Sequence, residues 1–66
     1  MDAKIIDDNI YLLTDRAVYR FDEDGLAKAN AESGAGEMFV FNDGNVMLCY
    51  EANTMLIKKD EFKVSD

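Results

Sequence analysis

The dipeptide Asp43-Gly44 lies between two apolar runs in the stretch FVFNDGNVML, and it constrains the fold more than any other local feature. An Asp-Gly pair in this setting is the strongest short-range signal for a β-hairpin with a two-residue turn, in which both central residues take a positive φ. A third apolar run, TMLIK, follows the polar turn sequence EAN. The sequence therefore predicts a meander of three antiparallel strands, at residues 37–41, 46–50 and 54–58.

The N-terminal part of the chain also carries strand signals. Two runs rich in β-branched and aromatic residues, at 10–14 and 17–21, are separated by the polar pair Asp15-Arg16. This pattern predicts a second hairpin, and residues 4–6 add a further short strand.

The segment between these two regions, DEDGLAKANAESGAG, predicts a short helix at residues 26–33. Asp22 or Asp24 suits the N-terminal cap, the alternate alanines favour a helix, and Gly34 suits its C-terminal end. A flexible loop is the alternative interpretation of this segment.

Together these elements predict an α+β fold for a single domain over residues 1–66. It contains a β-hairpin, a short helix and a three-stranded meander, joined in one small antiparallel sheet with the helix on one face. A chain of this length buries only about 60% of the surface that its unfolded form exposes. Cys49 is the single cysteine and histidine is absent, which excludes an intrachain disulfide and the common zinc ligand sets. We therefore expect a partner chain or a second copy to supply additional buried area.

No stretch of the sequence approaches the length of an apolar membrane span, and the N-terminus lacks the basic and apolar pattern of a signal peptide. We expect a cytoplasmic protein that does not bind a membrane.

Catalysis and metal binding find little support in the residue pattern. Without histidine the chain has no histidine-based acid, base or nucleophile pair, and Cys49 has no neighbouring lysine to activate its thiol. An EF-hand calcium loop with Gly25 at its sixth position would place Arg20 at the first and Ala31 at the twelfth, where acidic ligands are required. We predict a protein that is not an enzyme and that uses no metal or cofactor.

The net charge of −7 points to a basic protein partner rather than to nucleic acid. Phosphate contacts need lysine and arginine, whereas carboxylates can take the place of phosphates in a basic groove. If FDEDG is extended, Asp22 and Asp24 lie on one side, about 7 Å apart, similar to successive phosphates on a DNA strand. Solubility is the alternative role for these charges. The acidic residues that we predict to contact the partner are Asp7, Asp8, Asp15, Asp22, Glu23 and Asp24.

The stretch EMFVFNDGNVMLCYEAN, residues 37–53, resembles the aromatic-x-F-[DN]-D-G-[SN]-V-x-[LI] hairpins of small acidic proteins from bacteriophages and mobile elements, including some anti-CRISPR proteins. This resemblance implies a non-enzymatic inhibitor that binds a host nucleoprotein complex and blocks its nucleic-acid site.

The central hairpin is apolar on both faces, so a helix on one side leaves the other uncovered. Phe39, Phe41 and Met47 share that second side, and we predict that they contact a target protein or a second subunit. The alternative function is therefore a small structural or assembly protein that forms a homodimer through an apolar sheet face.

Overall fold

The computed structural model describes residues 1–64 and shows a small, compact antiparallel-sheet domain. Within these residues the helical structure is limited to the short 3₁₀ turn η1, Lys59–Glu61. The strands are β1 (Asp2–Ile6), β2 (Asn9–Leu13), β3 (Ala17–Asp22), β4 (Gly25–Asn30), β5 (Glu37–Val40), β6 (Val46–Cys49), β7 (Thr54–Ile57) and β8 (Lys63–Val64).

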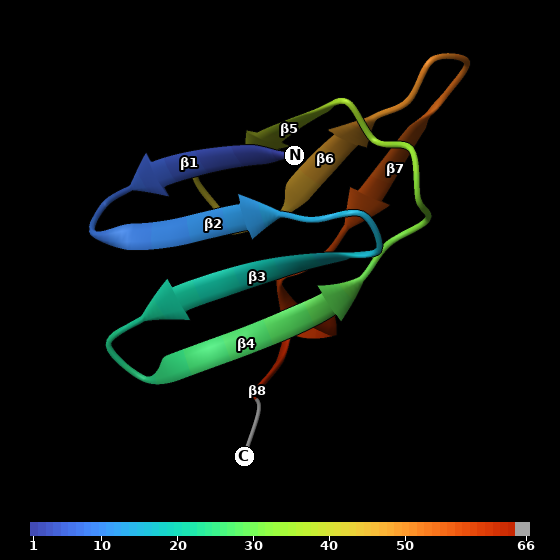
Figure 1. The fold of residues 1–66 in the computed structure, drawn as a ribbon. Coiled ribbons are helices and arrows are strands. Elements are labelled where there is room, and N and C mark those ends of the chain that lie inside the picture. Colours follow the sequence, from blue (N-terminus) through green and yellow to red (C-terminus); the bar gives the residue numbers. More distant parts are fainter. Residues whose placement is uncertain (65–66) are drawn as a thin grey trace.

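The strands form two antiparallel sheets that enclose one hydrophobic core (Figure 1). The larger sheet has the order β1-β2-β3-β4-β8, and the smaller has the order β5-β6-β7. Along β2, β4 and β6, buried residues alternate with more exposed ones, as the two-residue period of a strand requires. The buried cluster contains Tyr11, Leu13, Val18, Ala27, Ala29, Met38, Val46, Leu48, Ile57 and Phe62.

The predicted α+β fold, with one sheet and a helix on one face, is wrong. Residues of the expected helix form strand β4, in which Ala27 and Ala29 are only 2% and 3% exposed. Leu26 and Lys28 point to the opposite face, so the segment follows the two-residue period of a strand. Alanine has the highest intrinsic helix propensity, but propensity is a weak determinant of structure, and tertiary packing of the two methyl groups in the core overrides it. The face that a helix was expected to cover is covered by the second sheet.

The predicted strands themselves are present within one or two residues of their expected bounds. The turn at Asp43-Gly44 differs, because only Gly44 has a positive φ, of 92°. The Gly44 N–H donates to the Phe41 carbonyl at 3.0 Å, and the Phe41 N–H donates to the Asn45 carbonyl at 2.9 Å. This pattern is a three-residue loop in which a glycine forms the bulge.

A two-residue turn with positive φ at both central positions occurs instead at Asp7-Asp8, between β1 and β2. Their φ values are 49° and 68°, and Ile6 pairs directly with Asn9 across the turn. Asn-Gly is the preferred sequence for such a turn, although aspartate tolerates the left-handed conformation better than most residues.

The two sheets are joined at both sides of the core. On one side the Asp2 carboxylate, at the edge strand β1, accepts a hydrogen bond from the Met38 backbone N–H of β5 at 3.2 Å. On the other side the chain passes from β7 through η1 to β8, which pairs with β4. Phe62, 6% exposed, lies in this crossing and packs its ring edge-on against Tyr11, with 6.3 Å between the ring centroids.

The described part of the chain contains no helix that could span a lipid bilayer.

Candidate partner-binding site

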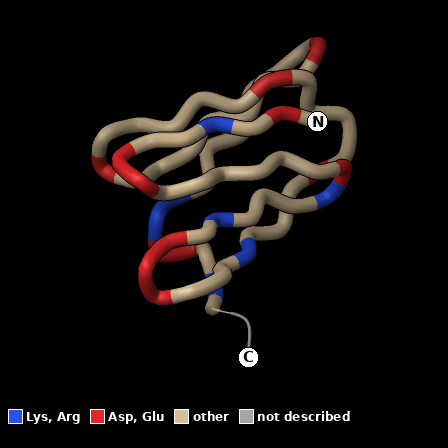
Figure 2. The backbone as a smooth tube through the Cα atoms, turned by 60° about the vertical axis from the view of Figure 1, so that its left-hand side comes forward, with Lys and Arg blue, Asp and Glu red and all other residues tan. Residues whose placement is uncertain are grey.

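Two acidic turns lie side by side at one end of the larger sheet. The β1–β2 and β3–β4 hairpins are neighbours in this antiparallel sheet, so their turns meet at the same end (Figure 1). Figure 2 shows the acidic segments gathered there. A pocket at this end is lined by Asp7, Asp8, Asn9, Asp22, Glu23 and Asp24. The structure therefore brings together five of the six acidic residues that the sequence singled out.

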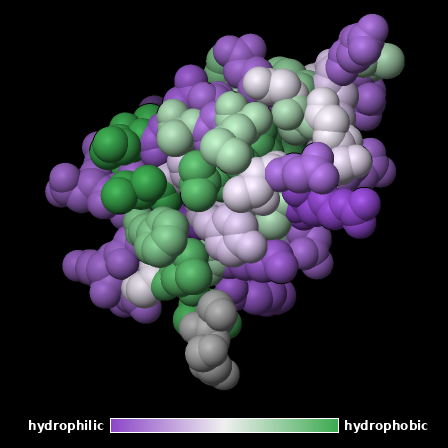
Figure 3. Space-filling model, in the orientation of Figure 1, coloured by the Kyte–Doolittle hydropathy of each residue, from purple (hydrophilic) through white to green (hydrophobic). Residues whose placement is uncertain are grey.

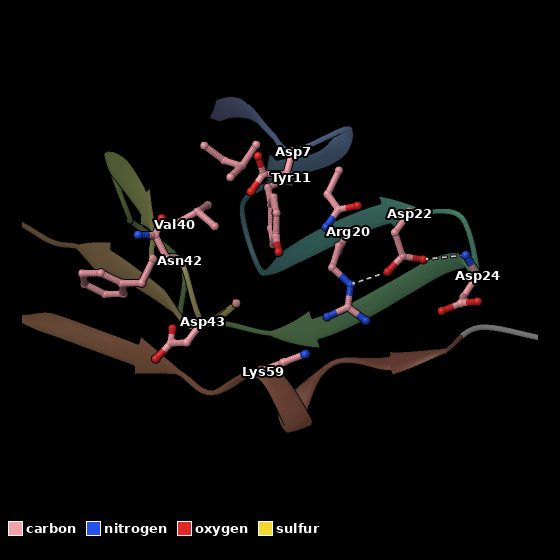
Figure 4. A pocket seen from close by; sticks show the side chains of 13 residues that line it. Asp7, Tyr11, Arg20, Asp22, Asp24, Val40, Asn42, Asp43 and Lys59 are labelled. Carbon is pink, nitrogen blue, oxygen red and sulfur yellow. Dashed lines mark hydrogen bonds and ion pairs between the residues drawn. The ribbon is translucent and has the colours of Figure 1, made fainter.

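Asp22 differs from its acidic neighbours because it has partners inside the protein. One carboxylate oxygen accepts a hydrogen bond from the Asp24 N–H at 2.9 Å, and the other lies 3.1 Å from Arg20 Nε (Figure 4). The Arg20 guanidinium lies 5.0 Å from the centroid of the Phe62 ring. Asp22 thus shapes the turn and neutralises a mostly buried arginine, which leaves its carboxylate less available to a partner.

The condition for the phosphate-like spacing of Asp22 and Asp24, an extended FDEDG segment, is not met. The prediction assumed an extended FDEDG segment, but Glu23 and Asp24 form the turn that reverses the chain between β3 and β4. A turn redirects successive side chains, so the regular spacing along a strand does not apply.

Asp15 lies at the opposite end of the sheet, in the β2–β3 turn, and is separated from the other five predicted acidic residues. Its carboxylate is 3.8 Å from the Arg16 guanidinium, and both side chains are about four-fifths exposed. Exposed ion pairs of this kind contribute little to stability.

Asp43 also lies at the acidic end, although the sequence did not predict it there. It lies in the β5–β6 turn of the other sheet and, with Asp7, Asp22 and Asp24, lines a cavity of about 300 Å³ between the two sheets (Figure 4). Tyr11, Arg20 and Lys59 also line this cavity. Asp43 and Asp7 are 36 positions apart, so no local pattern could have predicted that they meet.

The chemistry of this end is that of a charged surface. Among residues 1–64, no three or more His, Cys, Asp or Glu side chains are arranged so that they could hold a metal ion together. The Asp43 carboxylate accepts hydrogen bonds from the Asn45 N–H at 3.0 Å and from its side-chain amide at 3.2 Å. The exposed carboxylates of Asp7, Asp8, Glu23 and Asp24 are the groups that can meet a cationic partner.

An exposed apolar row lies next to the acidic turns, on the outer face of the larger sheet. Ile5 pairs with Ile10, Ile10 with Phe21, and Phe21 with Leu26, so one row crosses four strands. Ile5 is 75% exposed, and Ile10 and Phe21 are each 44% exposed. Apolar side chains gather over these strands in Figure 3.

This row was not predicted from the sequence, although the alternation of side chains along its strands indicates which residues share a face. Tyr19 and Phe21 share one face of β3, and Val18 is on the other. The prediction assigned the uncovered side to the central hairpin because it placed a helix, and not a second sheet, against that hairpin.

Phe39 and Met47, which the sequence predicted on an uncovered side, do lie on the outer face of the smaller sheet. They pair with each other, and Met47 pairs with Leu56, which gives a second apolar row. Phe39 and Leu56 are 42% and 50% exposed. Phe41 is 44% exposed at the start of the β5–β6 turn.

The opposite end of the molecule contains a tyrosine with a structural role. The Tyr50 hydroxyl donates to the Glu32 carbonyl at 2.7 Å and so fastens the β4–β5 connection to the end of β6. Burial, followed by the negative charge of Glu32, raises the pKa of Tyr50 above its ordinary value of 10.0.

Comparison with protein-family models, with curated proteins and with solved structures finds no match for this chain.

Proposed function

We propose that this chain is a non-enzymatic protein-binding domain that docks its acidic end on a basic, nucleic-acid-binding surface of a partner protein. The observation that carries the proposal is the meeting of the Asp7-Asp8 and Glu23-Asp24 turns with Asp43 at one end of the molecule. Carboxylates grouped in this way attract a basic surface over a distance and accelerate the encounter.

Such docking would exclude nucleic acid from the partner and so inhibit it. The hairpin resemblance to small acidic phage and mobile-element proteins supports an inhibitor of a host nucleoprotein complex of the CRISPR type, acting in the cytoplasm. The −7 net charge supports a protein partner and disfavours direct contact with nucleic acid.

The test compares two variants of equal net charge. The first neutralises the acidic end and keeps Asp22, because Asp22 holds Arg20. Asparagine replaces the turn aspartates since it also tolerates a positive φ. This acidic-end variant carries the changes Asp7→Asn, Asp8→Asn, Glu23→Gln and Asp24→Asn. The control neutralises as many acidic residues elsewhere, with the changes Asp15→Asn, Glu32→Gln, Glu37→Gln and Glu51→Gln.

Immobilised wild type and both variants are mixed with a bacterial lysate, and the retained proteins are quantified by mass spectrometry. We expect wild type and control to retain the same basic nucleic-acid-binding proteins, and the acidic-end variant to lose them. Added duplex DNA or RNA should displace these proteins, and rising salt should release them. Equal retention by the two variants would refute the proposal.

Self-association is a second candidate function, favoured by the row Phe39, Met47 and Leu56 on the smaller sheet. A homodimer through this row would supply the buried area that a small domain needs. Sedimentation equilibrium tests it: Leu56→Thr should convert a dimer to a monomer, and a strictly monomeric wild type would contradict it.

A further inference from the structure

The apolar row on the larger sheet has a regular spacing. Ile5, Ile10, Phe21 and Leu26 are direct cross-strand partners on four adjacent strands. Neighbouring strands lie about 4.8 Å apart, so the row extends about 14 Å across the sheet. Beside it on the same face of the larger sheet, Ala3, Leu12 and Tyr19 form a neighbouring row of cross-strand partners. This neighbouring row ends at Lys28, which pairs with Tyr19.

This spacing resembles that of one face of an α-helix. A helix advances about 5.4 Å per turn, and its residues at i, i+3, i+7 and i+10 share one face. A helix of roughly 11 residues laid across the strands would therefore present about one apolar side chain to each strand.

The charges beside the row specify the flank of such a helix. Two acidic turns, Asp7-Asp8 and Glu23-Asp24, lie on the same side of the row. Each of these four acidic residues is two positions along the chain from a residue of the row. The opposite side carries Lys28, whose ammonium lies 5.9 Å from the centroid of the Tyr19 ring. A partner helix that fits both sides has lysine or arginine along the flank that meets the turns and none along the other.

We propose that the outer face of the larger sheet binds an amphipathic α-helix of the partner protein, with an apolar stripe on the row and a basic flank on the two acidic turns. This proposal rests on the proposed function and names the structural element that the partner presents. A second copy fits less well, because its described residues contain no α-helix and it carries the same acidic turns. An anionic lipid surface would be repelled by those turns.

The probe is a synthetic helical peptide of about 14 residues, with leucines on one stripe and lysines along one flank. A scrambled peptide of the same composition removes the stripe, and a third peptide has glutamate in place of lysine. Binding is measured by fluorescence anisotropy over a range of salt concentrations. We expect the amphipathic lysine peptide to bind at least about tenfold more tightly than either control, with an affinity that falls as salt rises.

Two phenylalanines of nearly equal exposure provide a matched pair of variants. Phe21 is 44% exposed on the larger sheet, and Phe39 is 42% exposed on the smaller one. Threonine suits an exposed strand position, so Phe21→Thr and Phe39→Thr should both stay folded, which their thermal unfolding checks. Phe21→Thr should weaken peptide binding about tenfold, as loss of an aromatic anchor does, and Phe39→Thr should leave it unchanged.

The outcomes separate this inference from the proposed function. Failure of the wild type to bind the lysine peptide, or weakening by Phe39→Thr and not by Phe21→Thr, overturns the inference. Binding that survives Phe21→Thr but is lost on neutralising the acidic turns also overturns it, and leaves the proposed function intact. Sedimentation that shows a dimer disrupted by Phe21→Thr assigns the row to a second copy and likewise refutes the helix. Loss of lysate partners in the acidic-end variant remains the separate measure of the proposed function.

Discussion

The carboxylate of Asp2 and the backbone N–H of Met38 are joined by a hydrogen bond of 3.2 Å that links the edge of one sheet to the edge of the other. The other oxygen of the same carboxylate accepts from the Ala3 N–H at 2.9 Å. Edge strands expose unpaired N–H and C=O groups that invite association with other chains. Asp2 occupies one such group on each of the two edges.

Removing this link should loosen the corner between the sheets. Asp2→Ala should lower the free energy of unfolding by about 1 kcal/mol and increase the exchange rate of the Met38 amide. Denaturant titration and hydrogen exchange measure the two effects. Asp15→Ala, at an exposed ion pair, is the control and should change stability by less than about 0.5 kcal/mol. An unaltered exchange rate for Met38 would show that the hydrogen bond does not protect that edge.

Asp8 has a left-handed backbone conformation, with a φ of 68°, and removing the steric cost of this conformation should stabilise the protein. Asp8→Gly should raise the free energy of unfolding by about 1 kcal/mol, because glycine adopts this conformation without steric cost. Asp8→Asn removes the charge alone and separates its effect from that of the backbone. A destabilised Asp8→Gly protein would contradict this reading of the turn.

Replacing Gly44 should destabilise the protein, the opposite of the effect expected for Asp8→Gly. The φ of Gly44 is 92°, and a Cβ atom added there would lie 3.1 Å from the Lys59 Cδ. Gly44→Ala should therefore cost about 1 to 2 kcal/mol, measured by denaturant titration. Gly36→Ala, where a Cβ atom would have no neighbour within 4 Å, is the matched control and should cost less.

Phe62 should be essential for the fold because it lies where the chain crosses between the sheets. Phe62→Ala removes a core ring, at a cost of about 3 to 5 kcal/mol. That loss is comparable to the whole stability of a domain of this size, roughly 3 to 10 kcal/mol, so we expect a largely unfolded protein by circular dichroism. Phe62→Leu keeps most of the apolar volume and should remain folded at a smaller cost. A Phe62→Ala protein as stable as wild type would show that the crossing does not hold the sheets together.

The raised pKa of Tyr50 predicts a loss of stability in alkali. A group whose pKa is higher in the folded state contributes stability that is complete below its unfolded pKa, near 10, and is lost as pH rises through the folded pKa. Denaturant titrations at about pH 8 and about pH 11 should show a smaller loss for Tyr50→Phe than for wild type. At the lower pH, Tyr50→Phe should cost about 1 kcal/mol through the lost hydrogen bond to Glu32. Equal alkaline losses in the two proteins would show that Tyr50 does not control this effect.

The strand positions were predictable because their signals are local. Alternation of side chains and the polar pair Asp15-Arg16 specify β2 and β3, and the residues around Gly44 specify β5 and β6. Turn geometry was less predictable, since Asp-Gly suits both two-residue and three-residue hairpin loops. The helix prediction failed at Ala27 and Ala29, because the helix propensity of alanine favours a helix, whereas burial of these two side chains in the core favours a strand.

The candidate site was predictable only in part. Two hairpins that are neighbours in one sheet bring together Asp7, Asp8, Glu23 and Asp24. No local sequence pattern predicts that these hairpins are neighbours. Asp15 was assigned to the same surface on charge alone, and strand order places it at the other end. The partnership of Asp22 with Arg20 depends on which face of β3 is buried.

The sequence by itself determined the acidic charge, the strand-rich character of the chain and the positions of most of its turns, because these follow from composition and from neighbours along the chain. Only the tertiary structure decided that the chain forms two sheets, that Ala27 and Ala29 belong to a strand, and that the row from Ile5 to Leu26 faces outward beside the acidic turns. The physical reason is that burial is a property of the whole fold. A strand with apolar side chains on both faces can bury either face, and the packing of the other sheet determines which face is buried.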